Sequence, residues 1–147
     1  MDGNSYSPRV RLLVLAGLLA VLIGSQQVLA AAPGQSIFPI LRDKLGLTDT
    51  QARGAAGALL VYVRARLPKP EFDELAESIP NAERIMDEVK LRGIVTRPLD
   101  DLDDYESALG NLGIGQPLAS QVAPTIVEAL GATGHTRERD ILVEVLD

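Results

Sequence analysis

Apolar residues recur every three or four positions along most of the chain beyond residue 35, a spacing typical of helices that bury one face. Thr48 followed by Gln51 forms a capping-box sequence, so one such helix is expected to begin there and to run over 48–67. Gly54 and Gly57 lie within it, and a glycine inside a helix costs about 1 kcal/mol relative to alanine. We therefore expect a neighbouring helix to approach them closely. The apolar stripe consists of Ala52, Ala55, Ala56, Leu59, Leu60 and Val63.

Small residues in this pattern also occur where helices pair in membranes. Self-association through the small-residue face of 48–67 is therefore an alternative. Arg53, Arg64 and Arg66 make the helix too charged for lipid, which favours packing inside the domain.

Prolines, glycines and capping residues divide the rest of the chain into short helices. Ser36 is expected to cap the first helix, and Asn81 and Thr136 are expected to cap two later ones. Pro124 should bend its helix near Ser120. Residues 91–99 are expected to form a connector. The predicted helices are 37–45, 48–67, 70–79, 81–90, 102–112, 117–130 and 136–146.

This pattern predicts an all-α protein: a compact bundle of about six or seven short helices, with 36–147 as a single all-helical domain. The stretch beginning Leu45-Gly46-Leu47 has a similar stretch 67 positions later, beginning Leu112-Gly113-Ile114. The same shift places Leu75 on Leu142 and Ile79 on Leu146. Two half-repeats, 37–80 and 102–147, would explain the agreement. Two alanine-rich amphipathic helices after a Leu-Gly turn could also agree by chance.

The N-terminus has the pattern of a secretory signal peptide. Arg9 and Arg11 precede an apolar run at 12–24, and the small residues Ala30 and Ala32 fit cleavage by signal peptidase. We expect residues 1–30 to be a signal peptide and 31–35 a lead-in, which gives an exported, periplasmic or secreted protein. The run of 13 residues is shorter than the about 20 that span a bilayer, which favours a cleaved signal peptide. An anchor retained at 12–24 is the alternative.

The composition limits which kinds of core, ligand and site this protein can have. The 3% aromatic content indicates a core of aliphatic side chains, and the net charge of −6 argues against binding nucleic acid. The sequence contains no cysteine, so disulfides, thiolate metal sites and cysteine nucleophiles are excluded.

Three groups of residues are candidate sites. The acidic run Asp100–Glu106 could suggest calcium, but it lacks the EF-hand pattern, and carboxylates suit a helix N-terminus. His135 is the single histidine and is expected to be a surface residue. Glu74 and Glu77 could perform acid–base chemistry but are expected to be a solvated face. We assign no catalytic, cofactor-binding or metal-binding residue, and expect no cofactor.

Several short motifs resemble those of a known bacterial family. They are Leu45-Gly46-Leu47, Gln51-Ala52, the 54–59 run, Phe72-Asp73-Glu74-Leu75, Ile79-Pro80, the 109–114 run and Val122-Ala123-Pro124. Residues 37–146 resemble the VcgC/VcgE family of short exported proteins of unknown function. Between Asn81 and Asp101 the family favours glycine and alanine, whereas this chain is charged there. The resemblance implies an all-helical exported domain and supplies no activity or site residue.

We therefore expect a non-enzymatic, exported helical interaction or structural protein of the bacterial envelope. It would bind an unknown protein or envelope component through an aliphatic groove, or self-associate. A membrane-attached protein that retains its N-terminal helix is the first alternative, and a carboxylate-based enzyme of unfamiliar type is the second.

Overall fold

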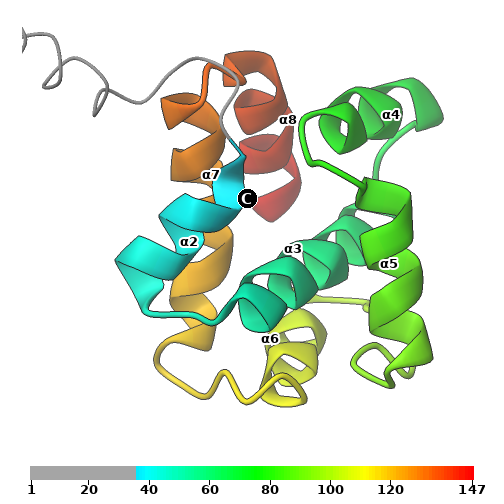
Figure 1. The fold of residues 1–147 in the computed structure, drawn as a ribbon. Helices are drawn as coiled ribbons and strands as arrows, with labels where there is room; N and C mark the ends of the chain where they lie inside the picture. The colour runs from blue at the N-terminus through cyan, green and yellow to red at the C-terminus, as the bar shows by residue number, and fades with distance from the viewer. Residues whose placement is uncertain (1–35) are drawn as a thin grey trace, which may run out of the picture. The chain divides into compact units, whose positions relative to one another are not determined.

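The computed structural model describes residues 36–147, so the predicted signal peptide at 1–30 and the lead-in at 31–35 lie outside the described part. The described residues form seven helices and no strand (Figure 1), which confirms the predicted all-α bundle. The helices are α2 (Ile37–Leu45), α3 (Asp49–Arg64), α4 (Lys69–Glu77), α5 (Ala82–Leu91), α6 (Leu102–Gly110), α7 (Ala119–Ala132) and α8 (Thr136–Leu146).

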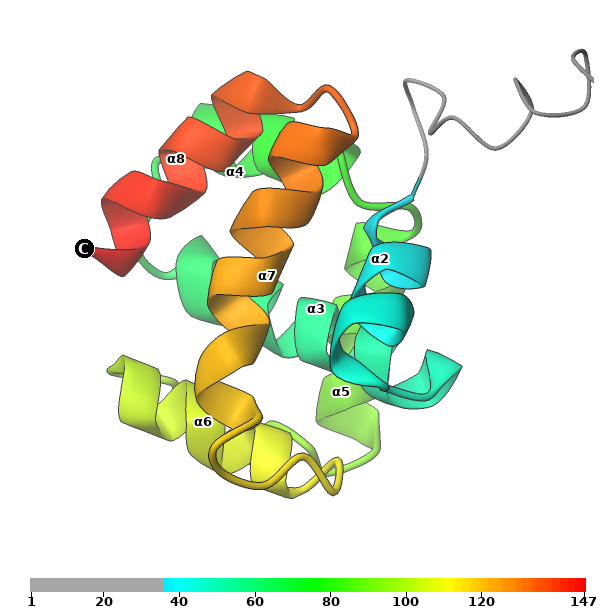
Figure 2. The same ribbon diagram turned by 90° about the vertical axis from the view of Figure 1, so that its left-hand side faces the viewer.

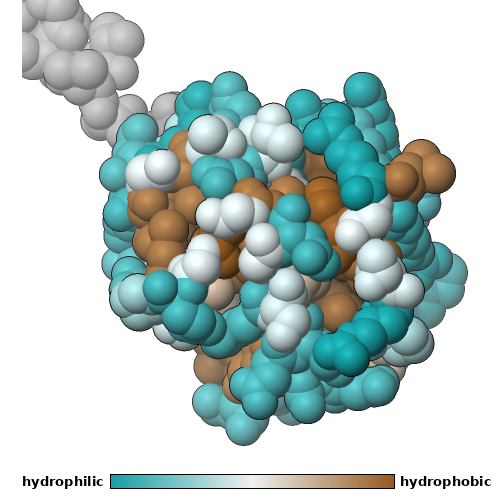
Figure 3. Space-filling view, turned by 90° about the horizontal axis from the view of Figure 1, so that it is seen from below, coloured by the Kyte–Doolittle hydropathy of each residue, from teal (hydrophilic) through white to brown (hydrophobic). Residues whose placement is uncertain are grey.

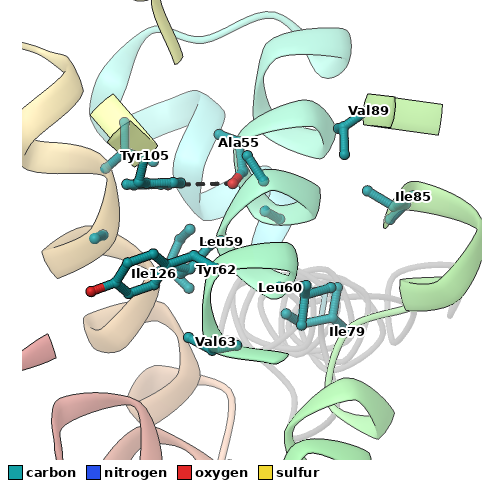
Figure 4. Close-up of a cluster of buried hydrophobic side chains, with 14 of the residues drawn as sticks. Ala55, Leu59, Leu60, Tyr62, Val63, Ile79, Ile85, Val89, Tyr105 and Ile126 are labelled. Carbon is teal, nitrogen blue, oxygen red and sulfur yellow. Dashed lines mark hydrogen bonds between the residues drawn. The ribbon is translucent and has the colours of Figure 1, made fainter. Parts of the chain in front are cut away.

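Helix α3 is the centre of the bundle. Ten of its 16 residues are buried, and it packs against α2, α4, α5, α6 and α7. In Figure 4, Ile126 of α7 and Ile85 of α5 lie on opposite sides of α3. Because five helices pack around α3, most of its residues are buried. Small alanine side chains suit such a position, which explains the composition of the predicted stripe.

The predicted capping box at the start of α3 is present. The Thr48 amide donates to Gln51 Oε1 at 3.0 Å, and the Gln51 amide donates to Thr48 Oγ1 at 3.1 Å. Gln51 also donates through Nε2 to the Leu112 carbonyl at 3.2 Å, which ties the start of α3 to the turn after α6. One side chain thus fixes both a helix start and a tertiary contact.

The two glycines of α3 are close to neighbouring residues, as predicted. A Cβ atom at Gly57 would lie 2.5 Å from Ile85 Cγ2 and 2.9 Å from the Ile85 carbonyl oxygen, and one at Gly54 would lie 2.7 Å from a Leu112 methyl. These distances confirm packing inside the domain. Ile85 and Val89 of α5 lie against Gly57, and Leu112 lies against Gly54. Self-association stays a prediction.

All seven predicted helices are present, and α2 and α8 have the predicted bounds. Ser36 Oγ accepts from the Phe38 amide at 3.3 Å, and Gly46 ends α2 with a left-handed φ of 66°. Pro124 lies inside α7. The bend expected near Ser120 stays a prediction.

Several details of the predicted boundaries were wrong. Helix α4 ends at Glu77 rather than at 79, α6 at Gly110 rather than at 112, and α7 at Ala132 rather than at 130. Helix α3 ends at Arg64 rather than at 67, and α7 begins at Ala119 rather than at Pro117 because a turn occupies the preceding residues. Asn81 has a φ of 59° and makes no side-chain cap bond. Thr136 is the first residue of α8, whose N-cap position is His135.

Helices from the two sequence halves pack across one another. Helix α2 packs on α7, α6 packs on α3, and α4 packs on α8. Figure 2 shows α7 running between α2 and α8 with α6 at its lower end. Gly46 and Gly113, which are 67 positions apart, both have left-handed φ angles, of 66° and 79°. This arrangement is compatible with two half-repeats, which stay a hypothesis.

Tyr105 of α6 is fully inside the core. Its hydroxyl donates to the Ala55 carbonyl of α3 at 3.3 Å, and its ring centroid lies 6.2 Å from that of Tyr62 (Figure 4). Burial raises the pKa of the Tyr105 phenol far above its ordinary value, and the Glu106 carboxylate adds to the increase. The phenol is therefore held neutral in the folded protein.

This shift predicts a loss of stability at alkaline pH. In the unfolded chain the phenol ionises near pH 10, whereas in the folded protein it keeps its proton. Its contribution is therefore complete below pH 10 and falls by about 1.4 kcal/mol per pH unit above it. Measured between pH 9 and 11, the free energy of unfolding of Tyr105→Phe should fall less steeply than that of the wild type. Equal slopes would contradict the assignment.

Candidate binding groove

A hollow of about 150 Å³ lies between α6, α7 and the end of α8. We call it the α7 groove. Its lining is Leu102, Tyr105 and Glu106 from α6, Ala119, Ser120, Ala123 and Pro124 from α7, and Leu146 from α8.

The groove exists because small side chains meet at this place. Ala119 and Ala123 leave space on α7, and the bond from the Tyr105 hydroxyl to Ala55 directs the phenol towards α3 rather than into the groove. Leu102 and Leu146 are only half-buried, so apolar surface remains open there. A larger residue at either alanine would fill the hollow.

The groove has the chemistry of a binding site for an apolar group. Its polar members are already engaged: Ser120 Oγ donates to the Pro117 carbonyl at 2.8 Å, and Glu106 accepts from Gln116 Nε2. Tyr105 is held neutral by its raised pKa. Pockets for cofactors and small molecules usually measure about 300–1,000 Å³, whereas about 150 Å³ suits one or two apolar side chains.

The acidic run Asp100–Glu106 forms the start of α6. Asp101 caps the helix by accepting from the Asp104 amide at 2.8 Å, and Asp104 pairs with Arg97 and accepts from the Asp100 amide at 3.1 Å. Within residues 36–147 no group of three possible metal-binding side chains comes together. Capping and ion pairing account for Asp101 and Asp104, Glu106 accepts from Gln116 Nε2, and Asp100 and Asp103 are exposed.

His135 and the two glutamates are not brought together. His135 Nδ1 lies 3.7 Å from Glu138 Oε1 at the start of α8. Glu74 Oε1 lies 2.7 Å from Arg137 Nε in an ion pair that joins α4 to α8, whereas Glu77 is exposed. The geometry gives none of the three a shared site.

A broader depression of about 640 Å³ lies beside α4 and the start of α5, and three carboxylates line it. Asp73 pairs with Lys69 at 2.5 Å, Glu83 pairs with Arg64 at 3.5 Å, and Glu77 is exposed. In carboxylates that act as catalytic acids or bases, burial or a like-charged neighbour usually shifts the pKa. Exposed and ion-paired groups such as these are typical of a solvated helix face.

Elsewhere apolar side chains reach the surface in smaller numbers. The large apolar residues exposed in the described part are Leu91, at 86%, and Val143, at 40%. Seen from below, brown apolar patches are separated by polar side chains (Figure 3). Single exposed apolar residues are common on protein surfaces, so the α7 groove is the better candidate for a binding site.

Sequence reasoning anticipated an aliphatic groove but not its place. The lining residues come from three helices, and Leu102 and Leu146 lie far apart in the sequence. The one local signal was the pair of small residues Ala119 and Ala123 beside Pro124.

No helix in the described part of the chain is long and apolar enough to cross a membrane.

Comparison with known proteins gives one match. A family model described as a protein of unknown function, VcgC/VcgE, matches residues 23–147. No curated protein and no solved structure matches the chain.

Proposed function

The chain belongs to the VcgC/VcgE family of proteins of unknown function, and we propose that it is an exported, non-enzymatic binding module. Its α7 groove would receive an apolar group of a protein or other component of the bacterial envelope. The observation that carries the proposal is the groove itself: an apolar hollow of about 150 Å³ on a domain whose other apolar side chains are mostly buried.

The polar chemistry of the described residues supports binding over catalysis. The carboxylates considered as sites are helix caps, members of ion pairs or exposed side chains. The groove offers no pair of nucleophile and base, since its tyrosine is held neutral and its serine donates to a backbone carbonyl. An apolar hollow of this size suits the side chains with which a partner is anchored at an interface.

Export is part of the proposal and rests on the N-terminal pattern of Arg9, Arg11 and the apolar run at 12–24. The expected result is that intact-mass measurement of protein recovered from producing cells shows the loss of about 30 residues, as a signal peptide requires. A mass that corresponds to the full sequence would favour the alternative, attachment to the membrane through 12–24.

We also propose that the domain consists of two half-repeats, 37–80 and 102–147. Support comes from the shared 67-residue shift and from the reciprocal packing of α2 on α7 and of α6 on α3.

A pair of matched variants tests the binding role. Ser120→Glu adds a carboxylate at the groove, and Gln121→Glu adds the same charge at the next residue of α7, which is exposed and outside the groove lining. In affinity capture from an envelope extract, we expect Ser120→Glu to reduce retention of the bound component about tenfold, the effect of about 1.4 kcal/mol. Gln121→Glu should bind as the wild type does.

Two results would contradict the proposal. One is that no component is retained by the wild type under mild conditions. The other is that both variants retain the component equally. Urea unfolding of each variant provides the control for folding, since substitutions at exposed positions usually change stability by about 0.5 kcal/mol or less.

A further inference from the structure

Helix α5 covers one side of α3. Gly57 lies against Ile85 and Val89 of α5, at distances that leave no room for a Cβ atom. The contact is continued by ion pairs on either side of this glycine. They are Arg53–Glu88, at 4.0 Å, and Arg64–Glu83, at 3.5 Å.

The corresponding side of α7 carries no such helix in the described part. The positions 67 residues after Arg53, Gly57 and Arg64 are Ser120, Pro124 and Gly131. Ser120 and Pro124 are exposed, and Gly131 is half-buried. Val127, also half-buried, lies between them. We call Ser120, Pro124, Val127 and Gly131 the α7 strip.

Packing around the two helices makes the difference clear. Helix α7 packs against α2, α3, α6 and α8. The 67-residue shift matches these helices, in the same order, with α6, α7, α2 and α4. Each of those four packs against α3. Helix α5 is the neighbour of α3 that remains without a counterpart on α7. The α7 groove adjoins this uncovered side, because Ser120 and Pro124 belong to both the groove and the strip.

We propose that the α7 strip and groove bind an amphipathic α-helix of a partner protein, which lies along α7 as α5 lies along α3. This inference rests on the proposed function and names the class of partner. The stripe of the partner helix would resemble that of α5, whose buried residues are Ala82, Ile85, Met86 and Val89. One of its apolar side chains would enter the groove, the usual arrangement when a helix binds in a groove.

The side chains along α7 indicate the shape and charge of this partner. Serine, proline and valine form the strip from 120 to 127, so a helix can approach α7 closely there, as α5 approaches α3 at Gly57. At Gly131 the Arg139 side chain of α8 already lies close, with its Cδ 3.2 Å from the position of an added Cβ atom. The carboxylates nearby are Glu106, which lines the groove, and Glu128, which Lys44 contacts at 2.9 Å. Lysine or arginine beside the apolar stripe of the partner would complement Glu106, whereas Glu128 is already paired with Lys44.

The probe is a pair of synthetic peptides of equal composition, each about 18 residues long so that a helix can form. One has leucine, isoleucine and alanine at helical spacing with lysines on the other face, and the second has the same residues in an order without a stripe. In a titration of the isotopically labelled full chain followed by NMR, the striped peptide should shift the amide signals of Ser120–Gly131 to saturation. The affinity of the scrambled peptide should be lower by at least about tenfold, a difference of about 1.4 kcal/mol.

Two valines provide matched variants. Val127→Glu places a charge on the strip outside the groove lining, whereas Val143→Glu places the same charge on an exposed position of α8. Binding of the striped peptide should weaken about tenfold for Val127→Glu and stay within twofold of wild type for Val143→Glu. Val127→Thr, which keeps the size of the side chain, provides a second variant if Val127→Glu fails to fold.

Equal binding of both peptides, or shifts confined to other helices, would overturn the inference. If Ser120→Glu reduces capture of the envelope component while the striped peptide does not bind, the groove keeps its proposed function and the helical partner is wrong. If neither effect is seen, both proposals fail.

Discussion

Replacing Gly57 by leucine is expected to separate α5 from α3 and to lower the free energy of unfolding by about 3 kcal/mol. A Cβ atom at this position would lie 2.9 Å from the Ile85 carbonyl oxygen and 3.0 Å from Val89 Cγ1. The backbone of α5 cannot rotate away as a flexible side chain can, so the whole helix must move. Urea unfolding followed by circular dichroism measures the change.

An alanine series gives the matched controls for this prediction. Alanine improves helix propensity by about 1 kcal/mol at an internal glycine such as Gly54 or Gly57, and by less at Gly110, the last residue of α6. A site that loses stability despite this gain reports on packing. At Gly110 nothing lies within 4 Å of the added Cβ, and at Gly54 the close atoms belong to the flexible side chain of Leu112. The expected order of stability is Gly110→Ala, then Gly54→Ala, then Gly57→Ala. Equal stabilities at Gly57 and Gly110 would contradict the close packing of α5.

Arg66 is the residue whose replacement should have the second largest effect. Its guanidinium donates to the carbonyl of Tyr62 at 2.8 Å, to that of Leu99 at 3.1 Å and to that of Asp100, and it lies 3.6 Å above the Tyr62 ring centroid. We expect Arg66→Ala to cost about 2 kcal/mol, since bonds from a charged donor and cation–π stacking are both lost. Arg66→Lys should recover little, because an ammonium group lacks the planar fork that reaches several carbonyls.

Arg64→Ala is the control for Arg66. Arg64 is exposed and pairs with Glu83 at 3.5 Å, so its loss should cost less than about 1 kcal/mol. The Arg66 variants should also release the connector before α6, which limited trypsin digestion would detect as faster cleavage after the exposed Arg92. Similar stabilities and cleavage rates for the two alanine variants would show that Arg66 does not hold the connector.

The sequence was informative wherever a short segment determines its own structure. Ser36 and Gly46 delimit α2, and the pair Thr48 and Gln51 starts α3, because each of these bonds joins residues a few positions apart. Asn81 and Pro117 misled the prediction. Asparagine also favours the left-handed conformation and proline also favours turns. Each takes that alternative here, since Asn81 has a φ of 59° and Pro117 lies in the turn before α7.

The contacts that join distant segments could not be predicted. Arg66 holds carbonyls 33 and 34 positions away, and no spacing rule connects it to Leu99 or Asp100. The α7 groove likewise required the positions of α6, α7 and α8 to be known. What the sequence did predict was that Gly54 and Gly57 meet a close neighbour, because their cost in a helix calls for compensation.

The central claim is that this domain binds its partner along α7. Site-specific photo-crosslinking in producing cells tests it most directly, with the crosslinking residue placed at Ser120 in one variant and at the exposed Asp87 on α5 in another. The account predicts a discrete protein adduct from position 120 that Val127→Glu reduces, and none from position 87. Adducts of equal yield from both positions, or an adduct from position 87 alone, would contradict it.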